Sequence, residues 1–152
     1  MRFSYNKNNS KWGGELLYIQ DEYSLTYKPC CKNINVSIII GAYTSLDTVV
    51  ETGEVVHISG LNPKDTWISK DMEFPKSEKG ELFAHFDKPP MKGTGIKYNE
   101  SWITYCNLGS SFICIGNPDV EDSDAHIEFA NGIVATIRKD QLISIWAKYR
   151  EL

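Results

Sequence analysis

The sequence predicts a mostly β fold: antiparallel meander sheets forming a sandwich or a partly open barrel, with at most one or two short helices. Aromatic residues are abundant, with 8 Tyr, 6 Phe and 4 Trp in 152 residues, and aromatic side chains suit pleated, half-buried surfaces. Turn-forming residues separate short apolar runs roughly every 8 to 12 residues. No segment carries a long apolar stripe of helical period with caps at both ends.

The clearest local prediction is a three-stranded meander near the C-terminal end. Asn131-Gly132 lies between apolar stretches, which favours a type I′ turn with positive φ at both residues. Lys139-Asp140 predicts a second reversal. With ideal alternation, one face carries Ile127, Phe129, Val134, Thr136, Ile143 and Ile145, and the other carries Ala130, Ile133, Ala135, Ile137, Leu142 and Trp146. Because both faces are largely apolar, we expect this meander to lie inside the fold.

Two further hairpins are expected, one pairing residues 101–106 with 112–115 and one pairing 47–51 with 54–58. For the second, a short helix capped by Ser45 and ended by Gly53 is the competing interpretation. Three β-branched residues before the turn favour the strand.

Other strands are expected at 12–19, 36–43 and 82–86. Residues 16–27 are also compatible with a short helix, which Gly13-Gly14 and Pro29 would keep short.

Length and composition predict one β-rich domain spanning residues 1–152. The start contains no apolar run typical of a secretion signal, and no stretch approaches the roughly 20 apolar residues of a membrane span. We therefore expect a cytoplasmic protein with four reduced cysteines: Cys30, Cys31, Cys106 and Cys114. Cys106 and Cys114 would face each other only if the hairpin register allows it.

No catalytic, cofactor or metal motif is present. His57, His85 and His126 fall in expected strands and have no partner at metal-ligating spacing. The cysteines have apolar neighbours, the serines lack a Gly-x-Ser-x-Gly elbow, and residues 92–97 lack a full phosphate-binding loop pattern. We expect no cofactor, no metal and no enzymatic activity, although a fold that converges the histidines would reopen the question.

Charge limits the classes of partner. The net charge is −4, whereas binding to nucleic acid or to an anionic membrane needs basic patches. We therefore expect neither of these partners. An acidic surface is compatible with a basic protein partner.

The acidic stretch of residues 119–124 is the notable charge run, and no Lys or Arg occurs from residue 98 to residue 137. A calcium loop is excluded because Asp124 and Ala130 stand where Gly and Glu are required. Two interpretations stay open, a solvated loop between strands and a docking patch for a basic protein. The candidate partner-binding residues of the second interpretation are Asp119, Glu121, Asp122, Asp124 and Glu128.

Trp67 is a further candidate. It lies in the irregular stretch of residues 60–80, where a tryptophan either anchors an interface or pins a long loop to the core. The sequence favours neither role, and we include Trp67 among the candidate partner-binding residues.

The closing module, Glu128-Phe-Ala-Asn-Gly-Ile-Val-Ala-Thr-Ile-Arg-Lys-Asp-Gln-Leu-Ile-Ser-Ile-Trp146, resembles bacterial immunity proteins that neutralise contact-dependent growth-inhibition toxins. Small size, acidic charge, cytosolic character and absent catalytic signatures add to the resemblance. Such families share no common fold or motif, so no residue role is carried over. The resemblance implies a cognate toxin, often a nuclease, whose basic active site is blocked in a tight one-to-one complex.

A small-ligand-binding β-barrel or sandwich is the alternative function, with residues 60–80 as a lid. A deep pocket with convergent polar groups and a histidine would favour this alternative. A filled core with an exposed acidic patch would favour the inhibitor.

Overall fold

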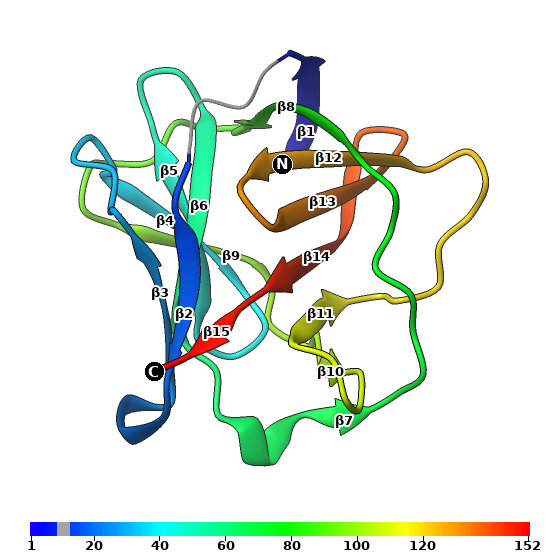
Figure 1. Ribbon diagram of the computed structural model, residues 1–152. Helices are drawn as coiled ribbons and strands as arrows, with labels where there is room; N and C mark the ends of the chain where they lie inside the picture. The colour runs from blue at the N-terminus through cyan, green and yellow to red at the C-terminus, as the bar shows by residue number, and fades with distance from the viewer. Residues whose placement is uncertain (9–12) are drawn as a thin grey trace.

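The computed structural model describes residues 1–8 and 13–152, and it confirms the mostly β fold, with 54% of residues in strands and 4% in helical turns. The strands form one strongly curled open sheet, a half-barrel (Figure 1). Helical structure in the described residues consists of two short 3-10 turns, Gln20–Glu22 and Lys64–Thr66. None of the described segments forms a helix with the length and apolar character needed to cross a membrane.

The strands in chain order are β1 (Arg2–Lys7), β2 (Glu15–Ile19), β3 (Ser24–Lys28), β4 (Val36–Ile40), β5 (Thr44–Val49), β6 (Glu54–Leu61), β7 (Ile68–Ser69), β8 (Glu78–His85), β9 (Gly95–Asn99), β10 (Thr104–Cys106), β11 (Phe112–Gly116), β12 (Ala125–Ala130), β13 (Ile133–Arg138), β14 (Gln141–Lys148) and β15 (Arg150–Glu151).

Strand β8 joins the two halves of the curled sheet. Its residues Gly80–His85 pair with β1, and Leu82 and Phe83 also pair with β6, whereas Glu78 and Lys79 pair with β12. The main path of the sheet is β15-β2-β3-β6-β8-β12-β13-β14-β11-β10-β7, with β1 on β8 and a branch from β6 through β5 and β4 to β9.

The sheet is less purely antiparallel than expected. Within residues 1–8 and 13–152, four pairings are parallel: β7 with β10, β8 with β12, β2 with β15 and β4 with β9. Each joins strands that are distant in sequence, and parallel neighbours need such long connections. Hairpin turn chemistry cannot reveal them.

The meander prediction is confirmed as β12-β13-β14, but its predicted faces are wrong. The β12–β13 register shifts after Glu128, and the β13–β14 register shifts after Thr136. Each extra residue turns the following side chains to the other face. Ideal alternation puts Val134 and Trp146 on opposite faces, whereas they are cross-strand partners. The face toward the main core carries Ile127, Ala135 and Ile145.

The predicted type I′ turn is also wrong. Gly132 has φ 77°, but Asn131 is not among the described residues with positive φ. The neighbouring bulge supplies extra twist, so one left-handed residue completes the turn. In the second reversal Lys139 takes φ 62°.

Both other predicted hairpins are confirmed, as β10-β11 and β5-β6. The competing helix near Gly53 is therefore wrong. The helix considered for residues 16–27 is wrong too, because β2 and β3 form a hairpin there. Trp12, the first residue of the strand predicted at residues 12–19, lies outside the described residues. Cys106 and Cys114 sit at adjacent pairing positions and so point to opposite faces.

The main hydrophobic core lies inside the curled sheet, and residues from both halves contribute to it. They include Phe3, Leu16, Ile38, Leu46, Leu82, Ile113, Ile133 and Ile145. A second cluster of Phe112, Cys114, Val134 and Trp146 lies on the opposite face of β11, β13 and β14, packed against Met72, Phe74 and Tyr105. The meander is therefore buried on both faces, as its sequence indicates.

Candidate functional site

The acidic loop between β11 and β12 is held by its own polar side chains and by one arginine. Asn117 Oδ1 accepts the amide N–H of Asp119 at 2.8 Å, and Asp124 Oδ2 accepts that of Glu121 at 2.8 Å. Arg138, at the end of β13, donates to both Asp124 carboxylate oxygens at 2.8 and 2.9 Å, and to the Asp119 carbonyl at 3.1 Å. These bonds fix the loop against the sheet.

Charge pairing dominates the electrostatics of this loop. Hydrogen bonding from Arg138 lowers the pKa of Asp124 below its ordinary value, against a smaller opposing effect of burial. The same hydrogen bond raises the pKa of Arg138. Burial lowers the pKa of His126, and the nearby Asp124 charge opposes that shift. At neutral pH, Asp124 and Arg138 form an ion pair and His126 is neutral.

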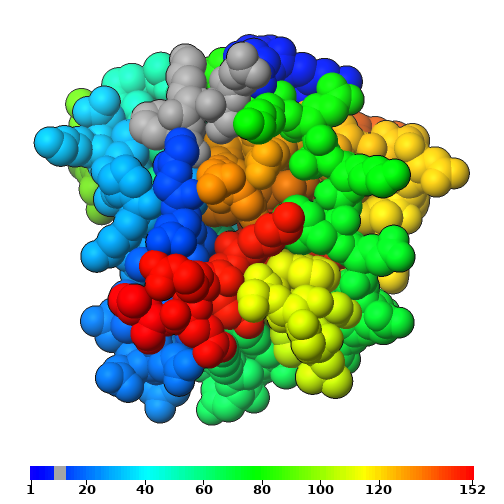
Figure 2. All heavy atoms as spheres, viewed as in Figure 1, coloured from blue at the N-terminus to red at the C-terminus, as the bar shows by residue number. Residues whose placement is uncertain are grey.

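A groove of about 840 Å³ lies between this loop and the extended segment of residues 70–76, which we call the strap. The strap and the loop adjoin at the right of the space-filling view (Figure 2). Six carboxylates line the groove against two ammonium groups: Asp71, Glu73, Asp119, Glu121, Asp122 and Asp124 against Lys70 and Lys76. Arg138 pairs with two of these carboxylates, Asp124 and Glu121, and the negative charge that remains in excess attracts cations.

Aromatic and polar groups form the floor of this groove. The Phe74 ring packs edge-on against Phe112 and Trp146, with centroids 5.4 and 6.3 Å apart. Trp146 Nε1 donates to Thr136 Oγ1 at 3.0 Å, and His126 Nδ1 lies 2.9 Å from the same hydroxyl. The floor is thus ordered and internally satisfied.

The structure brings four of the six predicted partner-binding residues together. Asp119, Glu121 and Asp122 are exposed at the groove, whereas the Asp124 side chain is covered. Glu128 lies on β12 outside the groove lining, and its carboxylate accepts the Gly132 amide N–H at 2.9 Å.

Trp67 does not line the groove. Its ring packs edge-on against Tyr18 and Tyr149, with centroids 5.3 and 5.7 Å away. Its Nε1 donates to Asn62 Oδ1 at 2.6 Å. In this structure Trp67 ties the 3-10 turn Lys64–Thr66 to the core.

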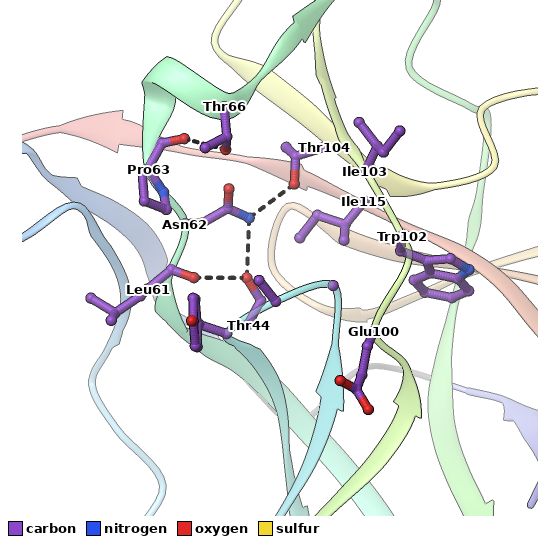
Figure 3. Close-up of a pocket in the computed structure, with 13 residues that line it drawn as sticks. Thr44, Leu61, Asn62, Pro63, Thr66, Glu100, Trp102, Ile103, Thr104 and Ile115 are labelled. Atoms are coloured by element: carbon purple, nitrogen blue, oxygen red, sulfur yellow. Dashed lines mark hydrogen bonds between the residues drawn. The ribbon is translucent and has the colours of Figure 1, made fainter.

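A smaller and more apolar pocket of about 240 Å³ opens at the ends of β5, β6 and β10 (Figure 3). We call it the socket. Tyr43, Leu61 and Ile103 stand exposed around it, and Ile115 lies deeper inside. Asn62, Thr44 and Thr104 form a buried polar floor. Its apolar wall and few polar groups are typical of a recognition pocket.

The histidines stay apart. His57 is buried, with Nδ1 3.0 Å from Asp47 and Nε2 accepting the Cys31 amide N–H at 3.3 Å. His85 Nε2 lies 2.6 Å from the Ser4 hydroxyl on the exposed β1–β8 pair. Across residues 1–8 and 13–152, no three His, Cys, Asp or Glu side chains gather as a metal site. Burial raises the pKa of Cys114 to about 12, so its thiol stays protonated.

Sequence reasoning misses Arg138, the strap carboxylates and the polar floor of the socket. Arg138 is the first cation after the acidic run, and this position in the sequence was a signal that it could pair with that run. Asp71 and Glu73 lie in a segment without periodicity, and only the fold brings them opposite the loop. Asn62, Thr44 and Thr104 are ordinary polar residues that no sequence pattern distinguishes.

Comparison of the chain with protein-family models and with curated proteins finds no match in either case.

Proposed function

We propose that this chain is an inhibitory binding protein of the cytosol, acting as an immunity protein does when it neutralises a toxin such as a nuclease. It binds one basic protein and occludes that protein's active site with the acidic groove. The observation that carries this proposal is the excess of carboxylates at the groove: six line it, against two lining ammonium groups and the Arg138 guanidinium that pairs with Asp124 and Glu121. Charge complementarity of this kind speeds encounter and excludes acidic competitors.

Three features of the site support the proposal. Arg138 holds the acidic loop in one conformation, so little ordering is required when a partner binds. The carboxylates of Asp119 and Asp122 are exposed to solvent and form no ion pair with the described residues. Side chains fill the core on both faces of the meander, so a partner would bind at the surface of the protein.

Small-ligand binding is the second candidate, and the socket is the observation that favours it. Its floor has convergent polar groups, but none of the three histidines lines it. The socket also opens among exposed apolar side chains, which is more typical of a protein contact.

The test is affinity capture by the tagged protein from a lysate of its own organism at low and high salt, followed by assay of the captured protein's activity. We expect one basic protein, released by salt because the attraction is electrostatic, and inhibited at a one-to-one ratio. Asp119→Lys with Asp122→Lys should weaken this binding by at least about tenfold, or about 1.4 kcal/mol. These positions avoid Asp124, which holds the loop.

The matched control is Asp21→Lys with Asp140→Lys, which makes the same change in net charge at exposed positions outside the groove. Equal weakening by both variants would mean that net charge alone governs binding. Unchanged binding in the groove variant would remove the groove from the interface.

A further inference from the structure

The polar floor of the socket has a defined hydrogen-bond direction. The indole of Trp67 can only donate, so the Asn62 atom that it contacts at 2.6 Å must be the amide oxygen. The Asn62 amide nitrogen therefore faces Thr44 Oγ1 at 3.0 Å and Thr104 Oγ1 at 3.1 Å and donates to both. Thr44 in turn donates to the Leu61 carbonyl at 3.2 Å.

Thr104 is the floor residue whose hydroxyl hydrogen has no acceptor among the described residues. Its hydroxyl accepts from Asn62, yet among the described residues no acceptor is assigned to its own O–H. The residue is only 8% exposed and lines the socket, where its hydroxyl lies at the polar floor (Figure 3). A buried donor of this kind favours an occupant that presents an acceptor atom.

The socket is not isolated from the acidic groove. A shallow depression between them shares Trp102 and Ile103 with the socket, and shares Lys70, Pro118 and Asp119 with the groove. The three hollows therefore lie next to one another on the surface. A single extended segment of a partner can occupy both ends.

We propose that the socket receives a tyrosine side chain of the basic protein that binds the acidic groove. This inference rests on the proposed function and names the anchor of that interface. The phenolic oxygen accepts a hydrogen bond from Thr104 while the ring packs among the apolar side chains at the socket. The cationic residues of the same segment lie along the groove.

Charge and chemistry select tyrosine among side chains. Among the described residues that line the socket, Glu100 alone carries a charge, and it pairs with Lys97 at 3.3 Å, so a carboxylate tip finds no cation there. Leucine or phenylalanine would fill the apolar part of the socket but would give the Thr104 hydroxyl no atom to donate to. Tyrosine combines an apolar body with a polar tip, and it is enriched among the residues that dominate interfaces.

The experiment is selection of displayed random linear peptides on the intact protein, with sequencing of the enriched pools. The variants are Thr104→Val, Thr104→Ser and the groove pair Asp119→Lys with Asp122→Lys. Wild type and Thr104→Ser are expected to enrich peptides that carry Lys or Arg together with Tyr. Thr104→Val should keep the cations but lower the Tyr-over-Phe preference by about tenfold, because it cannot donate to the phenol.

Each other outcome contradicts a specific part of the scheme. Cationic peptides without a Tyr preference, or a Tyr preference unchanged in Thr104→Val, overturn the socket inference and leave the proposed function standing. Tyr-containing peptides without cations, bound equally by the groove variant, overturn the proposed function. If Thr104→Val fails to fold, Leu61→Glu at the exposed rim replaces it and should abolish the Tyr preference while keeping the cations. Selection of no peptide contradicts both proposals.

Discussion

At the scale of single residues, neighbours in the acidic run have different roles. Asp119 and Asp122 are exposed, whereas the Asp124 side chain is covered and bound by the Arg138 guanidinium. Removing Asp124 would leave Arg138 without its main partner and Glu121 without the acceptor of its N–H. A run of like charge in the sequence therefore contains both a structural ion pair and free surface groups.

We expect Asp124→Asn to lower the free energy of unfolding by about 1–3 kcal/mol at pH 7, because a charge-assisted bond is lost. Since the pKa of Asp124 is lowered in the folded state, its contribution is full above the ordinary value of 3.8 and disappears as pH falls through the lowered pKa. Urea unfolding at several pH values measures this difference.

The control for that measurement is Asp122→Asn, an exposed neighbour for which we expect a change within about 0.5 kcal/mol. Equal effects of the two substitutions, or an Asp124 effect that persists unchanged well below pH 3.8, would contradict the role of the ion pair.

At the scale of elements, the strap has no regular structure but completes both the fold and the groove. Its Met72 amide N–H donates to Asn107 Oδ1 at 2.7 Å, and its Lys70 N–H donates to the Cys106 carbonyl at 2.9 Å. Phe74 covers Phe112 and Trp146, and the Lys148 ammonium lies 4.5 Å from the Phe74 ring centroid. The strap is therefore held by backbone hydrogen bonds at Lys70 and Met72 and by the packing of Phe74.

Phe74→Ala should loosen the strap locally, because the aromatic contacts on the second cluster are lost. We expect a loss of about 1–3 kcal/mol, less than for a fully buried phenylalanine. Hydrogen exchange should show faster exchange of the Met72 amide. Met91→Ala, at a position 78% exposed, serves as the control. Unchanged protection of Met72 in Phe74→Ala would show that the backbone bonds alone hold the strap.

At the scale of the whole molecule, the half-barrel depends on the junction where β8 meets β1 and β12. A Cβ at Gly80 would lie 2.5 Å from the Asn6 carbonyl oxygen and 2.9 Å from Ile127 Cγ2. The two halves approach so closely there that only glycine fits. Because one strand serves both halves, we expect them to unfold together.

Gly80→Ala should therefore destabilise the entire molecule by about 1–3 kcal/mol through overpacking. Tryptophan fluorescence and far-UV circular dichroism should report one coincident urea transition at a lower midpoint. Gly13→Ala is the matched control, since a Cβ there meets nothing within 4 Å. Two separate transitions in Gly80→Ala would contradict a shared junction.

Local sequence patterns predict much of the fold and part of the site. The β12-β13-β14 meander and the β5-β6 and β10-β11 hairpins follow from turn residues and apolar runs. Strands β1 and β9 escape prediction because each pairs with a strand distant in sequence. Strand β3 forms a hairpin with β2, in a stretch whose sequence was also compatible with a short helix. Asp119, Glu121, Asp122 and Asp124 share one loop simply because they are contiguous.

The sequence alone determined the β class, the main hairpins and the acidic loop, because these depend on backbone propensity, turn chemistry and charge within short segments. Only the tertiary structure decided the faces of the meander, since single-residue bulges at Glu128 and Thr136 reverse them. It also decided the parallel pairings, the strap opposite the acidic loop and the polar floor around Asn62. Each of these is a contact between segments far apart in the chain, and nothing within either segment encodes the presence of the other.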